Sequence, residues 1–183
     1  MATITRTLTY EEWLQMPTVE YGREEVVNGE LLTMAPPYLP HAFIIQRLIM
    51  CFAGQLDQKK VHILGSDFGL MISQEPLTCR SPDLALFWRG RVIERDGLCW
   101  APPGLVVEVI SKSETRRRKQ EKLDDYARIG VPEAWIISPK ARSVDIHLLS
   151  AGKLVSTKIA VDAEIQPTQF PGVSIPVAEI WPD

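Results

Sequence analysis

The sequence has few cysteines and histidines, and their positions exclude the common zinc and disulfide sites. Three of each are spread over 183 residues, without a CxxC pair or an HExxH spacing. Long apolar runs are also missing, because Gln46 and Arg47 interrupt the most apolar helical stretch well short of the roughly 20 residues that a membrane span needs. The N-terminus lacks the apolar stretch of a signal peptide. We therefore expect a cytoplasmic protein with reduced thiols and no membrane partner.

The overall composition is that of a soluble globular chain, but its positive charge is concentrated in one segment. Hydrophobic residues make up 45% and charged residues 23% of the chain, and the net charge is −3. Residues 112–122 nevertheless hold six basic side chains against two acidic ones. Such a patch can contact nucleic-acid phosphates on one face of the protein, although a merely solvated surface is the alternative. The candidates for phosphate contacts are Lys112, Arg116, Arg117 and Arg118.

Capping, turn and breaker residues divide the chain into helices and strands. Thr9 and Glu12 form a capping box, Asn28-Gly29 is typical of a type I′ hairpin turn, and Pro40 is expected to lie before the next helix. The expected elements are a short helix after Thr9 that Pro17 ends, a hairpin over 24–34, a helix over 41–58, strands over 61–64, 69–72, 82–87 and 105–110, a helix from Ser113 to Gly130, and strands over 133–138, 143–149 and 153–159.

This order of elements predicts an α/β (α+β) fold with a mixed β-sheet flanked by helices. The length of 183 residues fits a single domain. We expect a core over about 41–149, preceded by an N-terminal helix and hairpin over 9–34. The remaining segment, 151–183, is expected to be a proline-rich tail with one weak strand.

One acidic residue lies inside an apolar run that is typical of a buried strand. Glu108 is flanked by Val107 and Val109, and an unpaired carboxylate in such a strand costs several kcal/mol. Asp83 opens another apolar run 25 residues earlier. If the two strands are neighbours, the two acids can converge on one face of the sheet. Their hard oxygens, which repel each other without a cation, suit Mg²⁺ or Mn²⁺.

A lysine of the following helix can supply positive charge to this pair of acids. That helix runs back along the strand and rises about 1.5 Å per residue, so Lys122 lies roughly 13 Å from Ser113, about four strand residues back. Lys122 is then level with Glu108 or slightly beyond it, and Lys119 is also admissible. A structural alternative is that Glu108 forms a buried ion pair with Arg116 or Lys119, with Lys122 solvated.

Several short motifs follow one another from about Tyr21 to Leu149. They are Asn28-Gly29-Glu30, Pro36-Pro37 with His41, Ser81-Pro82-Asp83, Val106-Val107-Glu108-Val109-Ile110-Ser111, Glu121-Lys122, Tyr126, Gly130-Val131-Pro132 and Ala134-Trp135. No single motif is specific. Their order and spacing together resemble the PD-(D/E)XK nuclease superfamily, and within it the Uma-type restriction endonuclease family.

The resemblance implies a restriction-endonuclease-like core and metal-dependent hydrolysis of phosphodiesters in DNA. It implies that Asp83 and Glu108 bind Mg²⁺ or Mn²⁺ and that a lysine assists the attacking water. That lysine usually follows the glutamate by two residues, where this chain has Ile110. The resemblance assigns the role to Lys122, four residues before Tyr126, in preference to Lys119.

Two further residues are accessory candidates, and other functions stay open. Glu30 is either a hairpin residue or an outer metal ligand, and His41 either begins a helix or contacts a phosphate or water near the metal. Ile110 keeps open a catalytically inactive nuclease-fold protein that binds nucleic acid or protein. A hydrolase of small phosphorylated molecules is a third possibility. A homodimer joined through the 24–34 hairpin is one arrangement that would cut both strands.

Overall fold

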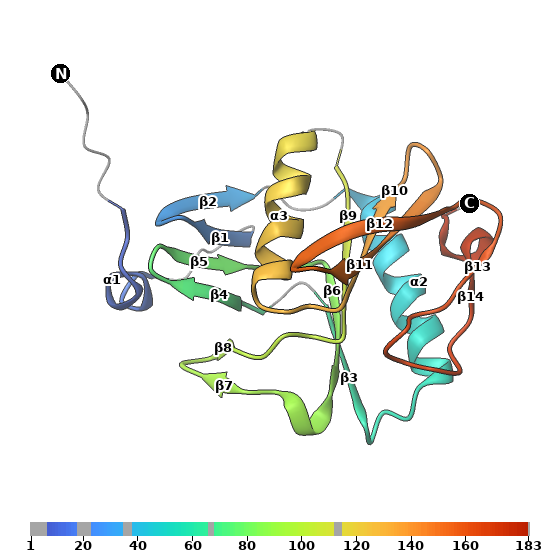
Figure 1. Cartoon of the computed structure of the whole chain (residues 1–183), viewed down its shortest axis with the longest axis horizontal. Coiled ribbons are helices and arrows are strands. Elements are labelled where there is room, and N and C mark those ends of the chain that lie inside the picture. Colours follow the sequence, from blue (N-terminus) through green and yellow to red (C-terminus); the bar gives the residue numbers. More distant parts are fainter. Residues whose placement is uncertain (1–6, 18–22, 35–37, 66–67, 112–114, 183) are drawn as a thin grey trace.

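Two six-stranded sheets and two long helices form most of the structure (Figure 1). It is a computed structural model that describes residues 7–17, 23–34, 38–65, 68–111 and 115–182. The helices are α1 (Tyr10–Leu14), α2 (Leu39–Gln55) and α3 (Arg116–Arg128), with 3₁₀ turns at η1 (Arg89–Arg91) and η2 (Val177–Ile180). Within the described ranges, no helix is both long and apolar enough to cross a bilayer.

The central sheet has the strand order β12-β11-β10-β9-β6-β3. Its one parallel pair joins β9 and β10 through α3, and its other neighbours are antiparallel. These strands are β3 (Val61–Gly65), β6 (Leu84–Trp88), β9 (Leu105–Val109), β10 (Glu133–Ser138), β11 (Ser143–Ser150) and β12 (Lys153–Ala160). The sheet is therefore mixed, as the sequence predicted.

The N-terminal hairpin belongs to a second sheet with the order β2-β1-β5-β4-β8-β7. Its strands are β1 (Arg23–Val27), β2 (Glu30–Met34), β4 (Leu70–Gln74), β5 (Leu77–Arg80), β7 (Glu94–Arg95) and β8 (Leu98–Cys99). Asn28 and Gly29 have φ angles of 51° and 79°, the positive values that a type I′ turn requires. Thr9 forms the expected capping box at the start of α1, which lies beside this sheet.

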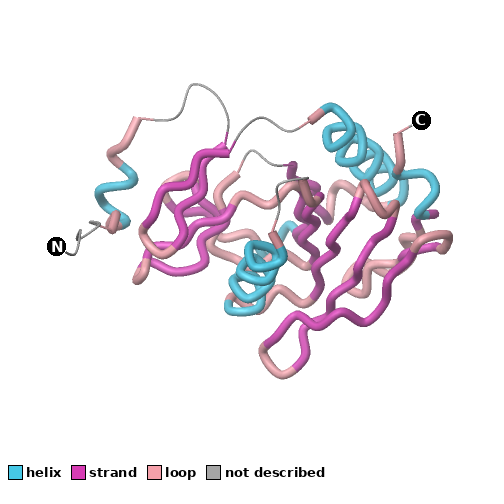
Figure 2. The backbone as a smooth tube through the Cα atoms, turned by 90° about the horizontal axis from the view of Figure 1, so that it is seen from above, coloured by secondary structure: helices cyan, strands magenta, loops and turns pink. Residues whose placement is uncertain are grey.

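The two long helices cover opposite faces of the central sheet, as the view from above shows (Figure 2). Side chains alternate between the faces of a strand, so β9 presents Val107 to α2 and Val106 to α3. The α2 side buries Ile44, Leu48, Phe52, Leu84, Leu86, Leu105, Val107 and Trp135, and the α3 side buries Ala85, Phe87, Val106, Leu123, Tyr126, Ala127 and Ile136.

The helix boundaries differ from the predicted ones in physically understandable ways. Pro40 lies in the first turn of α2 rather than before the helix, because a helix leaves the first-turn N–H groups unpaired and proline has none to lose. This helix ends at Gln55, three residues earlier than expected. The next begins at Arg116, and its N-cap is Thr115, whose side chain accepts from the Arg118 N–H. The predicted start at Ser113 lies outside the described residues.

The sequence analysis assigned too little to the hairpin sheet and to the C-terminal segment. It predicted one sheet and missed β5, β7 and β8, since these strands have only four, two and two residues, too few for a reliable pattern. The C-terminal segment is not a loose tail: β12 is a full strand, and β13 (Glu164–Ile165) pairs with β14 (Ile175–Pro176). Its apolar side chains pack into the same core as α2. Four of them are fully buried: Phe170, Ile175, Val177 and Ile180.

Candidate active site

Strands β6 and β9 bring the two predicted acids side by side. The antiparallel register places Leu84 opposite Val107, so the preceding residue, Asp83, lies opposite Glu108 one step further along. Both residues belong to the set that faces α3 rather than α2, and both are buried. The sequence predicted this convergence from two apolar runs that each contain one acid.

Asp83 is held by three donors. Its Oδ1 accepts from Arg23 at 2.8 Å, and its Oδ2 lies 3.0 Å from His41 Nε2 and accepts from the Val109 N–H at 2.8 Å. Burial alone would raise the pKa of this carboxyl, but the His41 hydrogen bond and the charges of His41, Arg23 and Lys122 outweigh it and lower the pKa to about 2. Asp83 is therefore an anion across the ordinary pH range.

Glu108 is held by two residues of α3, and its pKa is shifted in the opposite direction to that of Asp83. Lys122 Nζ lies 2.7 Å from Oε2, and the Tyr126 hydroxyl donates to Oε1. Burial and the charge of Asp83 outweigh Lys122 and raise the pKa of Glu108 to about 7. Burial would lower the pKa of Lys122, but the charge of Glu108 outweighs it and raises that pKa. The partner of Glu108 is thus Lys122, and the expected alternative of Arg116 or Lys119 was wrong.

The remaining predicted site residues differ in whether the structure brings them to the acids. His41 reaches Asp83 from the first turn of α2, while Lys119 turns toward Asp145, 3.9 Å away on β11. Glu30 is exposed at the turn end of the hairpin, whereas Arg23 at the open end reaches the acids, so the structure does not bring Glu30 to the site. Arg116, Arg117 and Arg118 are exposed, and Lys112 lies outside the described residues.

A small recess borders the Glu108 carboxylate. It has a volume of about 10 Å³ and is lined by Glu108, Val109, Ile110, Lys119, Lys122 and Ile136. Such a volume is of the order that one water molecule occupies. In the part of the chain that the structure describes, no group of three or more His, Cys, Asp or Glu could hold a metal. The donors that fit are two carboxylates completed by waters, a set that Mg²⁺ accepts because it keeps several waters.

A second ionic cluster lies next to the acids and was not predicted. Arg80 at the end of β5 lies between Glu25, at 2.9 Å, and Asp125 of α3, at 2.7 Å, and Glu25 also accepts from the Ser81 N–H at 3.1 Å. All three side chains are buried. Neither Arg23 nor this cluster could be found from the sequence, because the partners lie on segments that are far apart in the chain: Arg80 is 55 residues from Glu25 and 45 from Asp125.

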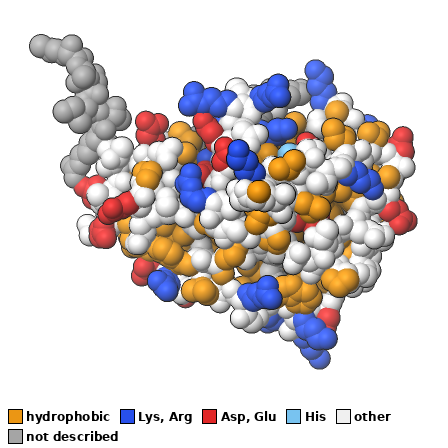
Figure 3. Space-filling model, viewed as in Figure 1, with side chains coloured by type: hydrophobic (Ala, Val, Ile, Leu, Met, Phe, Trp, Pro, Cys, Tyr) orange, Lys and Arg blue, Asp and Glu red, His pale blue; other side chains and the backbone are white. Residues whose placement is uncertain are grey.

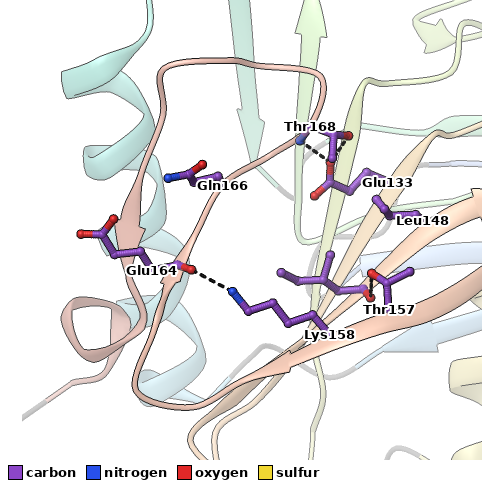
Figure 4. A pocket seen from close by; sticks show the side chains of 8 residues that line it. Glu133, Leu148, Thr157, Lys158, Glu164, Gln166 and Thr168 are labelled. Carbon is purple, nitrogen blue, oxygen red and sulfur yellow. Dashed lines mark hydrogen bonds between the residues drawn. The ribbon is translucent and has the colours of Figure 1, made fainter.

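A larger cavity lies away from the acids, between β11, β12 and the C-terminal segment (Figure 4). It measures about 380 Å³. Its polar groups bond to one another: Glu133 accepts from the Thr168 N–H at 2.7 Å, and Lys158 donates to the Glu164 carbonyl at 3.2 Å. These polar groups of the cavity are therefore already paired within the protein.

Comparisons with known proteins identify the family and the fold. A family model described as "Putative restriction endonuclease" matches residues 10–178. The chain belongs to this Uma2 family. The solved structure of a "putative nuclease belonging to DUF820" from Anabaena variabilis resembles it with a TM-score of 0.78 at 15% identity, covering 94% of this chain and 97% of that one. The comparison with curated proteins gave no match. The restriction-endonuclease-like fold that the sequence predicted is confirmed.

Proposed function

We propose that this Uma2 protein is a divalent-metal-dependent endonuclease that hydrolyses phosphodiester bonds in DNA. The observation that carries the proposal is the register of β6 and β9, which sets Asp83 opposite Glu108 on one face. Lys122 contacts the second acid at 2.7 Å. Two carboxylates and a lysine at neighbouring strand ends are the groups that metal-assisted hydrolysis of a phosphodiester requires.

Asp83 and Glu108 are the residues that would hold Mg²⁺ or Mn²⁺, with the Val109 carbonyl as a further ligand. When bound, such an ion would supply Lewis acidity and lower the pKa of a water molecule that it holds. Lys122 holds a fixed positive charge beside this position, where it orients the attacking water and stabilises charge that develops on the phosphate. The water oxygen would form a new bond to phosphorus and release a proton to solvent, while the bond to the leaving sugar oxygen breaks and that oxygen takes up a proton from solvent.

The residues around the acids fix their orientation. Tyr126 donates to Glu108 and the Val109 N–H donates to Asp83, so one oxygen of each acid is held toward the protein. Hydrogen bonds of this kind keep ligands in one geometry. His41 contacts Asp83, and 15% of its side chain is exposed; we expect it to contact a phosphate or water near the metal.

DNA would approach along the basic end of α3. Lys and Arg side chains gather there on the surface (Figure 3), and Arg116, Arg117 and Arg118 are exposed in the first turn. The same helix carries Lys122 on its buried side. Phosphate contacts at this end would align the backbone without reading the base sequence.

Plasmid nicking tests the proposal. Purified protein with Mg²⁺ or Mn²⁺ should convert supercoiled plasmid to open circles, and Asp83→Asn or Glu108→Gln should abolish the reaction while keeping side-chain volume. Thermal unfolding of each variant checks that it is folded. Plasmid left intact by the wild-type protein across metals and salt concentrations, or cut equally by both variants, contradicts the proposal.

A second candidate is a nuclease-fold protein that binds nucleic acid or protein without cutting. Two observations favour it: Ile110 occupies the position of the usual lysine, and each acid already has a cationic partner. Calorimetric titration with Mn²⁺ separates the two. The enzyme should have a divalent site that disappears in Glu108→Gln, whereas the inactive protein should have none.

A further inference from the structure

Arg23 is the residue at the acids for which the proposed mechanism gives no role. It begins β1 at the open end of the hairpin, opposite Met34, and donates to Asp83 Oδ1 at 2.8 Å. Among the described residues, Asp83 is its hydrogen-bond partner. Its side chain is 24% exposed, against 3% for Asp83. Arg23 therefore lies between the buried acids and the solvent.

The charges at the two acids are already balanced by the protein. Arg23 pairs with Asp83, Lys122 pairs with Glu108, and each of the four carboxylate oxygens accepts a hydrogen bond from the protein. A divalent cation that binds both acids would be repelled by these two cations, because like charges a few ångströms apart interact strongly at a buried site. It would also compete with Arg23 for Asp83 Oδ1.

The side chains of Lys122 and Arg23 differ in how readily they can move away from the two acids. Lys122 projects from the middle of α3 and is 11% exposed, and its partner Glu108 is also fixed by Tyr126 from the same helix. Arg23 is about twice as exposed and stands at the first position of its strand. A long side chain at that place can turn outward without disturbing the sheet. Of the two cations, Arg23 is therefore the one that can move away from its carboxylate partner.

We propose that Arg23 exchanges Asp83 for the scissile phosphate of the substrate. Its planar guanidinium can donate to two phosphate oxygens at once. When Arg23 turns to the phosphate, Asp83 Oδ1 becomes free for the divalent cation, and the phosphate charge replaces the carboxylate that Arg23 has left. This inference rests on the proposed function, to which it adds a substrate-contacting residue. It also couples the two ligands, since metal and DNA each favour the outward Arg23.

Mn²⁺ titration followed by electron paramagnetic resonance tests this exchange at pH 8, with and without a short DNA duplex of mixed sequence carrying phosphorothioate linkages. Without DNA, Arg23→Gln should bind Mn²⁺ about fivefold more tightly than the wild type, because the competing cation is gone. DNA should tighten Mn²⁺ binding in the wild type and have a smaller effect in the variant. Plasmid nicking should fall about 100-fold, as for loss of one donor to the reacting group.

Three controls make each outcome decisive. Arg91→Gln makes the same charge change at an exposed residue after the far end of β6 and should behave as wild type. Arg23→Lys keeps the charge without the two-pronged contact, so it should retain wild-type Mn²⁺ affinity and still nick more slowly; it also serves if Arg23→Gln does not fold. Equal or weaker Mn²⁺ binding by Arg23→Gln, or full nicking by Arg23→Lys, overturns the exchange. Unchanged Mn²⁺ binding by Glu108→Gln instead overturns the metal site itself.

Discussion

Two ionic clusters lie side by side in this protein and share three segments, while β9 contributes to one cluster alone. The closed cluster consists of Glu25, Arg80 and Asp125, and the open cluster of Arg23, Asp83, Glu108 and Lys122. Strand β1 supplies one residue to each cluster, two positions apart, and α3 supplies one to each, three positions apart. The segment from the end of β5 to the start of β6 supplies Arg80 and Asp83.

The clusters differ in which sign lies at the centre. In the closed cluster one guanidinium lies between two carboxylates and is only 5% exposed, so its charges are satisfied inside the protein. In the open cluster two carboxylates lie next to each other, with one cation on either side and a recess beside Glu108. A buried ion pair can be purely structural, because removing one partner leaves an uncompensated buried charge. Two features distinguish a candidate active site from a structural ion pair: the acids are adjacent, and one counterion is partly exposed.

The largest expected effect comes from breaking the Arg80–Asp125 ion pair of the closed cluster. Asp125→Asn leaves the Arg80 guanidinium with one carboxylate and should lower the free energy of unfolding by about 3–5 kcal/mol, as for other broken buried pairs. Chemical denaturation measures this loss. Mn²⁺ affinity of the folded variant should stay at the wild-type value, and a loss of Mn²⁺ binding would show that the two clusters are not separate.

Replacing the lysine of the open cluster should affect the reaction more than the fold. Lys122→Met keeps the length of the side chain and removes its charge beside Glu108, so nicking should slow by about 100-fold. Lys119→Met is the matched control on the same helix, because Lys119 is directed toward Asp145. A comparable loss in the control would mean that the sequence-based preference for Lys122 over Lys119 was wrong.

The raised pKa of Glu108 gives the open cluster a pH dependence near neutral pH. A proton must leave Glu108 before a metal can bind, and its pKa is raised to about 7. Mn²⁺ affinity should therefore rise about tenfold per pH unit below that value and level off above it. Calorimetry at pH 5.5, 6.5 and 7.5 measures the slope, and an affinity independent of pH contradicts the assignment.

The same titration affects the stability of the metal-free protein in the opposite direction. A carboxyl whose pKa is raised from 4.5 to about 7 on folding adds stability below pH 4.5, and this contribution is lost as the pH rises through 7. The melting temperature should fall over that interval, and the fall should be smaller in Glu108→Gln. Equal slopes in both proteins would show that Glu108 is ionised at lower pH.

The smallest expected effect is at the exposed basic turn of α3. Arg117→Gln with Arg118→Gln should weaken DNA binding a few-fold, and the slope of its salt dependence should fall by about one unit for each phosphate that is no longer neutralised. Fluorescence anisotropy at several salt concentrations measures this slope. An unchanged slope would mean that these arginines are only a solvated surface.

The sequence predicted the central sheet and its acids because strong local signals mark them. Apolar runs mark β6 and β9, and a single acid at the start of one run and inside the other identifies Asp83 and Glu108. The helical rise places Lys122 level with Glu108. The contact at 2.7 Å confirms that placement. The catalytic and metal-binding roles of these residues stay predictions, as do DNA as substrate and a dimer.

The second sheet and Arg23 could not be predicted because they depend on contacts between distant segments. Strands β7 and β8 have two residues each, too few to show alternation. Arg23 and Asp83 are 60 residues apart, and nothing in the polar segment around Arg23 indicates its partner. Glu30, by contrast, was chosen for its position in a motif, and the hairpin geometry places it at the opposite end from Arg23.

The most direct measurement is a crystal soaked in Mn²⁺ and recorded at a wavelength where manganese scatters anomalously. A single anomalous peak between the carboxylates of Asp83 and Glu108, with Arg23 turned away from Asp83, is the result that the proposed site predicts. Density that shows Arg23 and Lys122 still bound to the two acids, with no peak between them at saturating Mn²⁺, would contradict it.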